Sequence, residues 1–280
     1  MSSPTQPMNG PAPAPYAYTS PIPVRRAHLG DALASEWTKI RSVRSTMWTL
    51  GVMALLMLGI GLAVGAVAAA SMSEYSEEPA LGLGFFGVLP ASICVITLGV
   101  LTISSEYGTG MIRTTLTACP SRGRVLAAKA IIFFVLVFTL VTVLAGVVGA
   151  AQVSMVDAAT PSAGEWLRAT VGVGLFLSLL GLLGMGIGAI VRHSAGAITV
   201  MIGVLLLPLV AAMFMFSEAL RSLQAALLTY ALPSQMIALY SETAPFEGKG
   251  PAGWEPVLIL FGLTAAVLGG AFALLNSRDV

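Results

Sequence analysis

Charged residues are scarce in this chain. Only 10% of its 280 residues are Asp, Glu, Lys or Arg, whereas 56% are hydrophobic, and the mean hydropathy is +0.89. A soluble domain typically carries about 25% charged residues because its surface faces water. So few charges cannot cover a globule of this size, which excludes an ordinary soluble domain. The net charge of +1, with no basic cluster outside the loops, gives no sign of a nucleic-acid partner.

Cysteine and histidine are also too few for a disulfide framework or a metal site. The two cysteines are Cys94, inside an apolar segment, and Cys119, in a basic loop, and there is no CxxC spacing. His28 and His193 lie far apart in the sequence, and no HExxH motif occurs. We therefore expect two free thiols, no metal and no catalytic residues in this chain.

The sequence lacks its own source of energy for transport. Ionisable side chains occur only at the ends of the apolar segments, as with Glu106 and Arg168. A charge near the middle of a membrane span costs about 2.5–3.5 kcal/mol and is retained mainly for a use such as binding a coupling ion. There is also no GxxxxGK[ST] phosphate-binding motif. We expect no cofactor in this chain, and any ATP must be bound by a partner subunit.

What the chain does have is six long apolar segments. They cover residues 47–70, 81–103, 126–150, 169–191, 196–216 and 256–275. About twenty residues at 1.5 Å each cross the ~30 Å hydrocarbon core of a bilayer as a helix. The pattern predicts an all-α integral membrane protein, with a six-span domain over residues 47–280. Closely spaced glycines such as Gly181, Gly184 and Gly188 predict close helix packing.

Two different segments precede the first span. Residues 1–24 contain seven prolines and no charge, which predicts a disordered cytoplasmic tail. Residues 25–46 form an amphipathic pattern that predicts a helix lying in the membrane interface, with Glu36 inside its apolar stripe. We expect Glu36 to pair with Lys39, three residues later. The other residues assigned to this interfacial helix are Trp37, Arg41 and Arg44.

Lys and Arg are distributed asymmetrically between the two sides of the six spans. If both termini are cytoplasmic, the outer side holds three of the 14 Lys and Arg residues, namely Arg168, Arg221 and Lys249. Such an excess on one side predicts that this side is the cytoplasm. In the last outer segment, 217–255, Pro233 separates two short helical patterns. We interpret them as interfacial or re-entrant half-helices, although a simple capping loop fits the pattern equally well.

The loop after the second span carries the most informative motif. Residues 104–116 read SSEYGTGMIRTTL, followed by Pro120, Arg122, Arg124 and Lys129, and residues 36–45 read EWTKIRSVRS. With the six spans, these segments resemble the permease subunits of type-2 ATP-binding-cassette (ABC) exporters, especially an actinobacterial subgroup. The resemblance covers residues 28–275.

The resemblance implies an assembly in a bacterial cell membrane. Two permease subunits, identical or not, pair with two ATPase subunits, and the loop after the second span forms a short coupling helix that docks on the ATPase. By the same resemblance, the coupling region includes Glu106, Thr109, Arg113, Pro120, Arg122 and Lys129.

The resulting hypothesis is a multi-pass permease that exports a hydrophobic or amphiphilic substrate with energy from a separate ATPase. Two alternatives remain at this point. A self-contained secondary carrier would transport without an ATPase, and a membrane anchor or regulator would bind a partner without moving a substrate.

Overall fold

The computed structural model describes residues 28–71, 80–118, 121–241 and 250–277. The expected tail 1–24, Cys119 and Pro120 lie outside these residues. The described part is built from helices. Six of them are long and apolar enough to cross a membrane: Arg44–Ser71, Ala80–Gly108, Arg122–Met155, Ala163–Val191, Ser194–Met213 and Glu255–Ser277. This confirms the prediction of an all-α membrane protein with six candidate spans.

The spans consist of the following elements. Helix α2 is Arg44–Ser71, and the second span joins a 3₁₀ turn η1 (Ala80–Gly84) to α3 (Phe85–Gly108). The third is α5 (Arg122–Met155), and the fourth joins α6 (Ala163–Leu167) and a π-helical turn η2 (Arg168–Gly172) to α7 (Val173–Val191). The last two are α8 (Ser194–Met213) and α11 (Glu255–Ser277).

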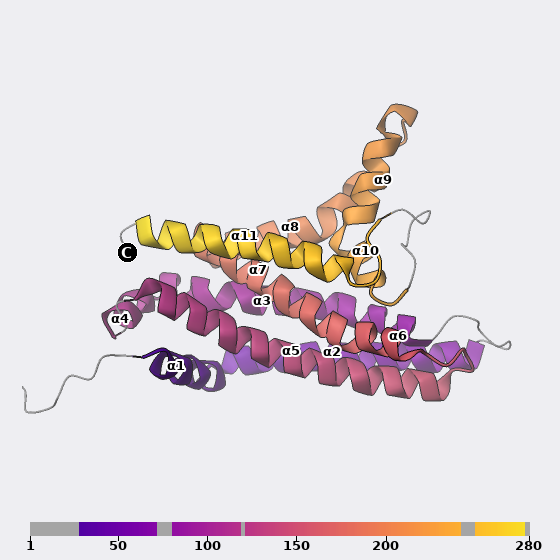
Figure 1. Cartoon of the computed structure of the whole chain (residues 1–280), viewed down its shortest axis with the longest axis horizontal. Coiled ribbons are helices and arrows are strands. Elements are labelled where there is room, and N and C mark those ends of the chain that lie inside the picture. Colours follow the sequence, from indigo (N-terminus) through magenta and orange to yellow (C-terminus); the bar gives the residue numbers. More distant parts are fainter. Residues whose placement is uncertain (1–27, 72–79, 119–120, 242–249, 278–280) are drawn as a thin grey trace, which may run out of the picture.

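Helix α7 forms the centre of the bundle and packs against α3, α5 and α11 (Figure 1). The most apolar part of its span is 83% buried, compared with 22% for each of α2, α8 and α11. Glycine allows this close packing, since a Cβ atom on Gly99 of α3 would collide with the backbone carbonyl of Gly181 in α7. The glycine pattern therefore predicted a real helix–helix contact.

One end of the bundle carries the two short helices α1 (Leu29–Ser42) and α4 (Met111–Ala118), together with the C-terminal end of α11 (Figure 1). The amphipathic helix α1 is shorter than the predicted 25–46 region. The chain becomes extended at Val43, with φ −84° and ψ 111°, and Arg44 already lies in the first turn of α2. The position of α1 in a membrane interface stays a prediction.

The opposite end carries α6 and the segment between α8 and α11. That segment contains a 3₁₀ turn η3 (Glu218–Leu220), α9 (Arg221–Tyr230) and α10 (Leu232–Ile237). Helix α10 packs against α8 and α3 and is largely buried, whereas α9 has no buried residue and projects from the bundle (Figure 1). Two short helices therefore lie in this segment, with their break at Ala231 and Pro233 in the first turn of α10. Their interfacial or re-entrant position stays a prediction.

Candidate functional site

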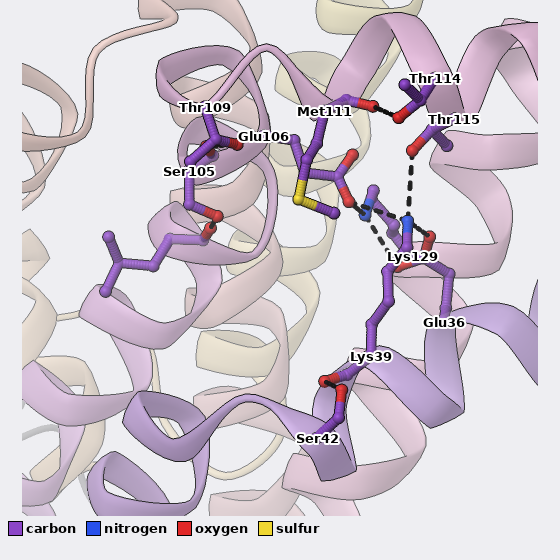
Figure 2. Close-up of polar contacts among 11 residues, drawn as sticks. Glu36, Lys39, Ser42, Ser105, Glu106, Thr109, Met111, Thr114, Thr115 and Lys129 are labelled. Atoms are coloured by element: carbon purple, nitrogen blue, oxygen red, sulfur yellow. Dashed lines mark hydrogen bonds and ion pairs between the residues drawn. The ribbon is translucent and has the colours of Figure 1, made fainter.

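Four charged side chains meet where α1, α3 and α5 approach one another. Glu36 and Lys39 come from α1, Glu106 comes from the last turns of α3, and Lys129 comes from the second turn of α5. Figure 2 shows their head groups pointing toward a common centre. We call these four residues the ion-pair cluster.

The cluster is a closed network of short contacts. Lys129 Nζ lies 2.7 Å from Glu36 Oε2 and 2.7 Å from Glu106 Oε1. Lys39 Nζ lies 2.8 Å from Glu36 Oε1 and 2.9 Å from Glu106 Oε1. Each ammonium group therefore bridges both carboxylates, and the predicted pairing of Glu36 with Lys39 is confirmed.

Most of the cluster is shielded from water. The side chain of Lys129 is 1% exposed, those of Glu36 and Glu106 are 6% and 7% exposed, and that of Lys39 is 26% exposed. A buried charge is tolerated only when it is paired and hydrogen-bonded. Two carboxylates and two ammonium groups cancel, so the site is electrically neutral while all four groups are ionised.

Lys39 is the most accessible member of the cluster, and its surroundings change its proton affinity. Partial burial acts to lower its pKa, but the hydrogen bonds to Glu36 and Glu106, with the charges of both carboxylates, raise the pKa above its usual 10.5. Lys39 is therefore fully charged at neutral pH. Its ammonium group also lies 3.4 Å from the Thr115 hydroxyl of α4, which extends the network to a fourth helix.

The other predicted coupling residues in the described part of the chain, Thr109, Arg113 and Arg122, lie outside the cluster. Thr109 ends α3 and donates a hydrogen bond to the Ser105 carbonyl, whereas Arg113 is exposed on α4. The Arg122 guanidinium, at the start of α5, donates a hydrogen bond to the Leu275 carbonyl near the end of α11. Arg122 therefore connects the start of α5 with the end of the last span.

The remaining interfacial residues lie on the outside of the α1–α2 corner. The Arg41 guanidinium carbon lies 6.0 Å from the centre of the Trp37 ring, within the range of a cation–π contact. Arg41 and Arg44 line a shallow hollow of about 250 Å³ at this corner. These side chains are exposed, so the structure separates them from the cluster, which contains only Glu36 and Lys39 from their group.

The cluster lies inside the part of the chain that matches a known family. Residues 32–205, more than half of the chain, match the family model described as ABC-2 family transporter protein. The chain belongs to this family. It is therefore the membrane permease subunit of an ABC transporter, a transport component and not itself an enzyme. Such permeases normally work with an ABC ATPase. A comparison with curated proteins gives no significant match.

The ABC-2 permease buries its cluster in a way that sequence reasoning missed. The sequence placed Glu36 and Lys39 in one group and Glu106 and Lys129 in another, because 67 residues separate Lys39 from Glu106. Lys129 was assigned to the coupling region as one cation of a basic loop, and its near-complete burial was not expected. The sequence did contain one sign of this site, namely Glu36 inside an apolar stripe. A buried carboxylate needs more than one exposed partner.

Proposed function

We propose that this chain is the permease of an ATP-driven exporter in a bacterial cell membrane, working beside a second permease subunit. In this proposal a separate ATPase docks on the end of the bundle that carries α4, and this end faces the cytoplasm. The observation that carries the proposal is the ion-pair cluster, which links α4 to three other helices of the bundle.

The contacts explain how motion of α4 can reach the spans. Helix α4 follows α3 after a short turn at Gly110, whose φ of +72° favours glycine. Lys39 contacts Thr115 of α4, Glu36 of α1 and Glu106 of α3, and Lys129 ties both acids to α5. Displacing α4 therefore pulls on α1, α3 and α5 together, as in the rigid-body transitions of packed helices.

The distribution of cations supports the cytoplasmic assignment of this end. Arg113, Arg122 and Lys129 lie at the ends of α4 and α5 near α1, and the Arg192 guanidinium lies 5.1 Å from the centre of the Tyr107 ring. Arg168 and Arg221 belong to η2 and α9 at the opposite end (Figure 1). This is the asymmetry that the positive-inside rule describes.

The proposal is tested by purifying the chain in mild detergent from its native membrane and identifying the chains that co-elute. We expect a stoichiometric nucleotide-binding subunit. Repeated recovery of the intact, folded permease without such a subunit would contradict the proposal and favour a self-contained carrier or an anchor.

A matched pair of arginine variants then tests the docking surface. Arg113→Ala removes an exposed cation from α4, and Arg221→Ala removes an exposed cation from α9 at the other end of the bundle. We expect Arg113→Ala to lower the ATPase activity of the reconstituted complex, or the amount of ATPase bound, while Arg221→Ala leaves both unchanged. Equal effects of the two variants would show that α4 is not the docking element.

A further inference from the structure

A cavity lies between α1, α2 and α3, beside the ion-pair cluster. Its volume is about 310 Å³, and all four cluster residues contribute to its lining. This volume is at the lower end of the range of about 300–1,000 Å³ that is usual for small-molecule sites. We call it the α1–α3 cavity. Its location makes the cluster one wall of a space large enough for a ligand.

The lining of the α1–α3 cavity has an apolar and a polar part. Ile40 of α1, Val43 between α1 and α2, and Leu98 and Leu101 of α3 supply aliphatic surface. The polar part consists of the cluster and several hydroxyl-bearing side chains, among them Ser45, Thr46, Thr49 and Thr102. With α1 in the membrane interface, as the sequence predicts, the corner between α1 and the first span lies where lipid head groups meet acyl chains. Such a lining suits a molecule with one polar and one apolar end.

The hydrogen bonding of the cluster restricts the chemistry of the polar end. Its two acids and two lysines already balance, so a charged head group would bring a surplus charge into a shielded site, which is costly. One acceptor remains open, because Glu106 Oε2 is buried and accepts no hydrogen bond among the described residues. Leaving a buried acceptor without a donor is unfavourable. A neutral hydrogen-bond donor, such as an alcohol, satisfies it without adding charge.

Met111 is a flexible apolar side chain beside Glu106 on the cavity wall. It lines the same cavity and lies next to Glu106 in Figure 2. Methionine side chains have three rotatable bonds and adapt to irregular shapes. A ligand could therefore displace the Met111 side chain to reach Glu106 Oε2.

We infer that the α1–α3 cavity binds a neutral amphiphile with a hydroxyl-bearing head group, drawn from the membrane leaflet next to α1. The inference rests on the proposed function in one respect only: the proposed cytoplasmic orientation of this end makes that leaflet the inner one. The head group donates a hydrogen bond to Glu106, and the chain lies along Ile40, Val43 and Leu98. An occupant therefore touches the side chains that connect α4 with the spans.

The first test is photolabelling of the full-length permease alone in lipid nanodiscs. The probe is a dodecyl chain that carries a diazirine and a glycerol ether head, and the comparison probes carry a carboxylate or a trimethylammonium head on the same chain. We expect the glycerol probe to label α1–α3 about tenfold more than either charged probe, a difference that corresponds to ~1.4 kcal/mol. Equal labelling by all three, or preference for a charged head, would overturn the inference.

Two threonines of α3 provide a matched control for the location of the site. Thr102 lines the cavity and Thr97 does not, although both are half-buried and donate to the carbonyl four residues earlier, at 2.7 and 2.8 Å. We expect Thr102→Phe to fill the cavity and abolish labelling by the glycerol probe, and Thr97→Phe to leave it unchanged. Thr49→Phe, which fills the cavity from α2, should act like Thr102→Phe. Persistent labelling in both filling variants would refute the site.

A second measurement identifies the source of the ligand. In the reconstituted complex with its ATPase subunit, ATP turnover lowers labelling of the cavity if the amphiphile is a transported substrate and leaves it constant if it is a resident lipid. Both results agree with ligand binding in the cavity. A failure to co-purify an ATPase subunit would contradict only the proposed function. Labelling of the permease alone therefore separates the two proposals.

Discussion

Replacing Lys129 by methionine is the most direct test of the ion-pair cluster. The substitution keeps a long, flexible side chain but removes the ammonium group that contacts Glu36 and Glu106 at 2.7 Å each. Two carboxylates then share only Lys39, so the site holds a surplus negative charge. The side chain of Glu106 is 7% exposed, so water replaces the lost partner only in part.

The expected loss of stability follows from this imbalance. Removing one partner of a buried ion pair usually costs about 3–5 kcal/mol. We expect about 3 kcal/mol for Lys129→Met, the lower end of this range, because Lys39 still contacts both carboxylates. Lys39→Met should cost less, since the side chain of Lys39 is 26% exposed and water can compensate part of the loss.

The assay is equilibrium unfolding in mild detergent, followed by the fluorescence of the four tryptophans. The double variant Glu36→Gln with Lys129→Met separates charge balance from packing, because it leaves Lys39 and Glu106 as a neutral pair. We expect the double variant to be more stable than Lys129→Met alone, although it carries one more substitution. A Lys129→Met protein within about 1 kcal/mol of the parent, or a double variant no more stable than the single one, would refute this account of the cluster.

Two further predictions concern pH and helix packing. Because the pKa of Lys39 is raised in the folded protein, its contribution to stability is complete below pH 10.5 and is lost as pH rises above that value. Lys39→Arg, which stays charged at higher pH, should reduce this alkaline loss in unfolding measured between pH 8 and 12. Gly99→Ala should destabilise the chain by about 1–3 kcal/mol, because its Cβ meets the Gly181 backbone. A Cβ atom on Gly59 would meet no atom of the described residues within 4 Å, so Gly59→Ala should be neutral or stabilising in the same denaturation assay. Equal costs of the two variants would contradict the packing argument.

The sequence was most informative where a local pattern has one physical meaning. Six apolar segments without a central charge can only be spans, and their helices appear at the predicted places. The helix of the third span, α5, is longer than its apolar segment 126–150, since it begins at Arg122 and ends at Met155. Apolar side chains mark only the part of a helix that is embedded in lipid. The backbone hydrogen bonds of the helix continue beyond that part.

The cluster shows why the rest could not be read from the sequence. Glu36 and Lys39 are neighbours on α1, so their pairing follows from helix geometry alone. Glu106 and Lys129 reach them only because α3 and α5 pack on α1, and hydrophobic periodicity does not specify which helices become neighbours. Sequence alone therefore established the membrane class, the span order and one ion pair. Tertiary packing joined two separate groups of charges into one neutral, buried site and placed the α1–α3 cavity beside it.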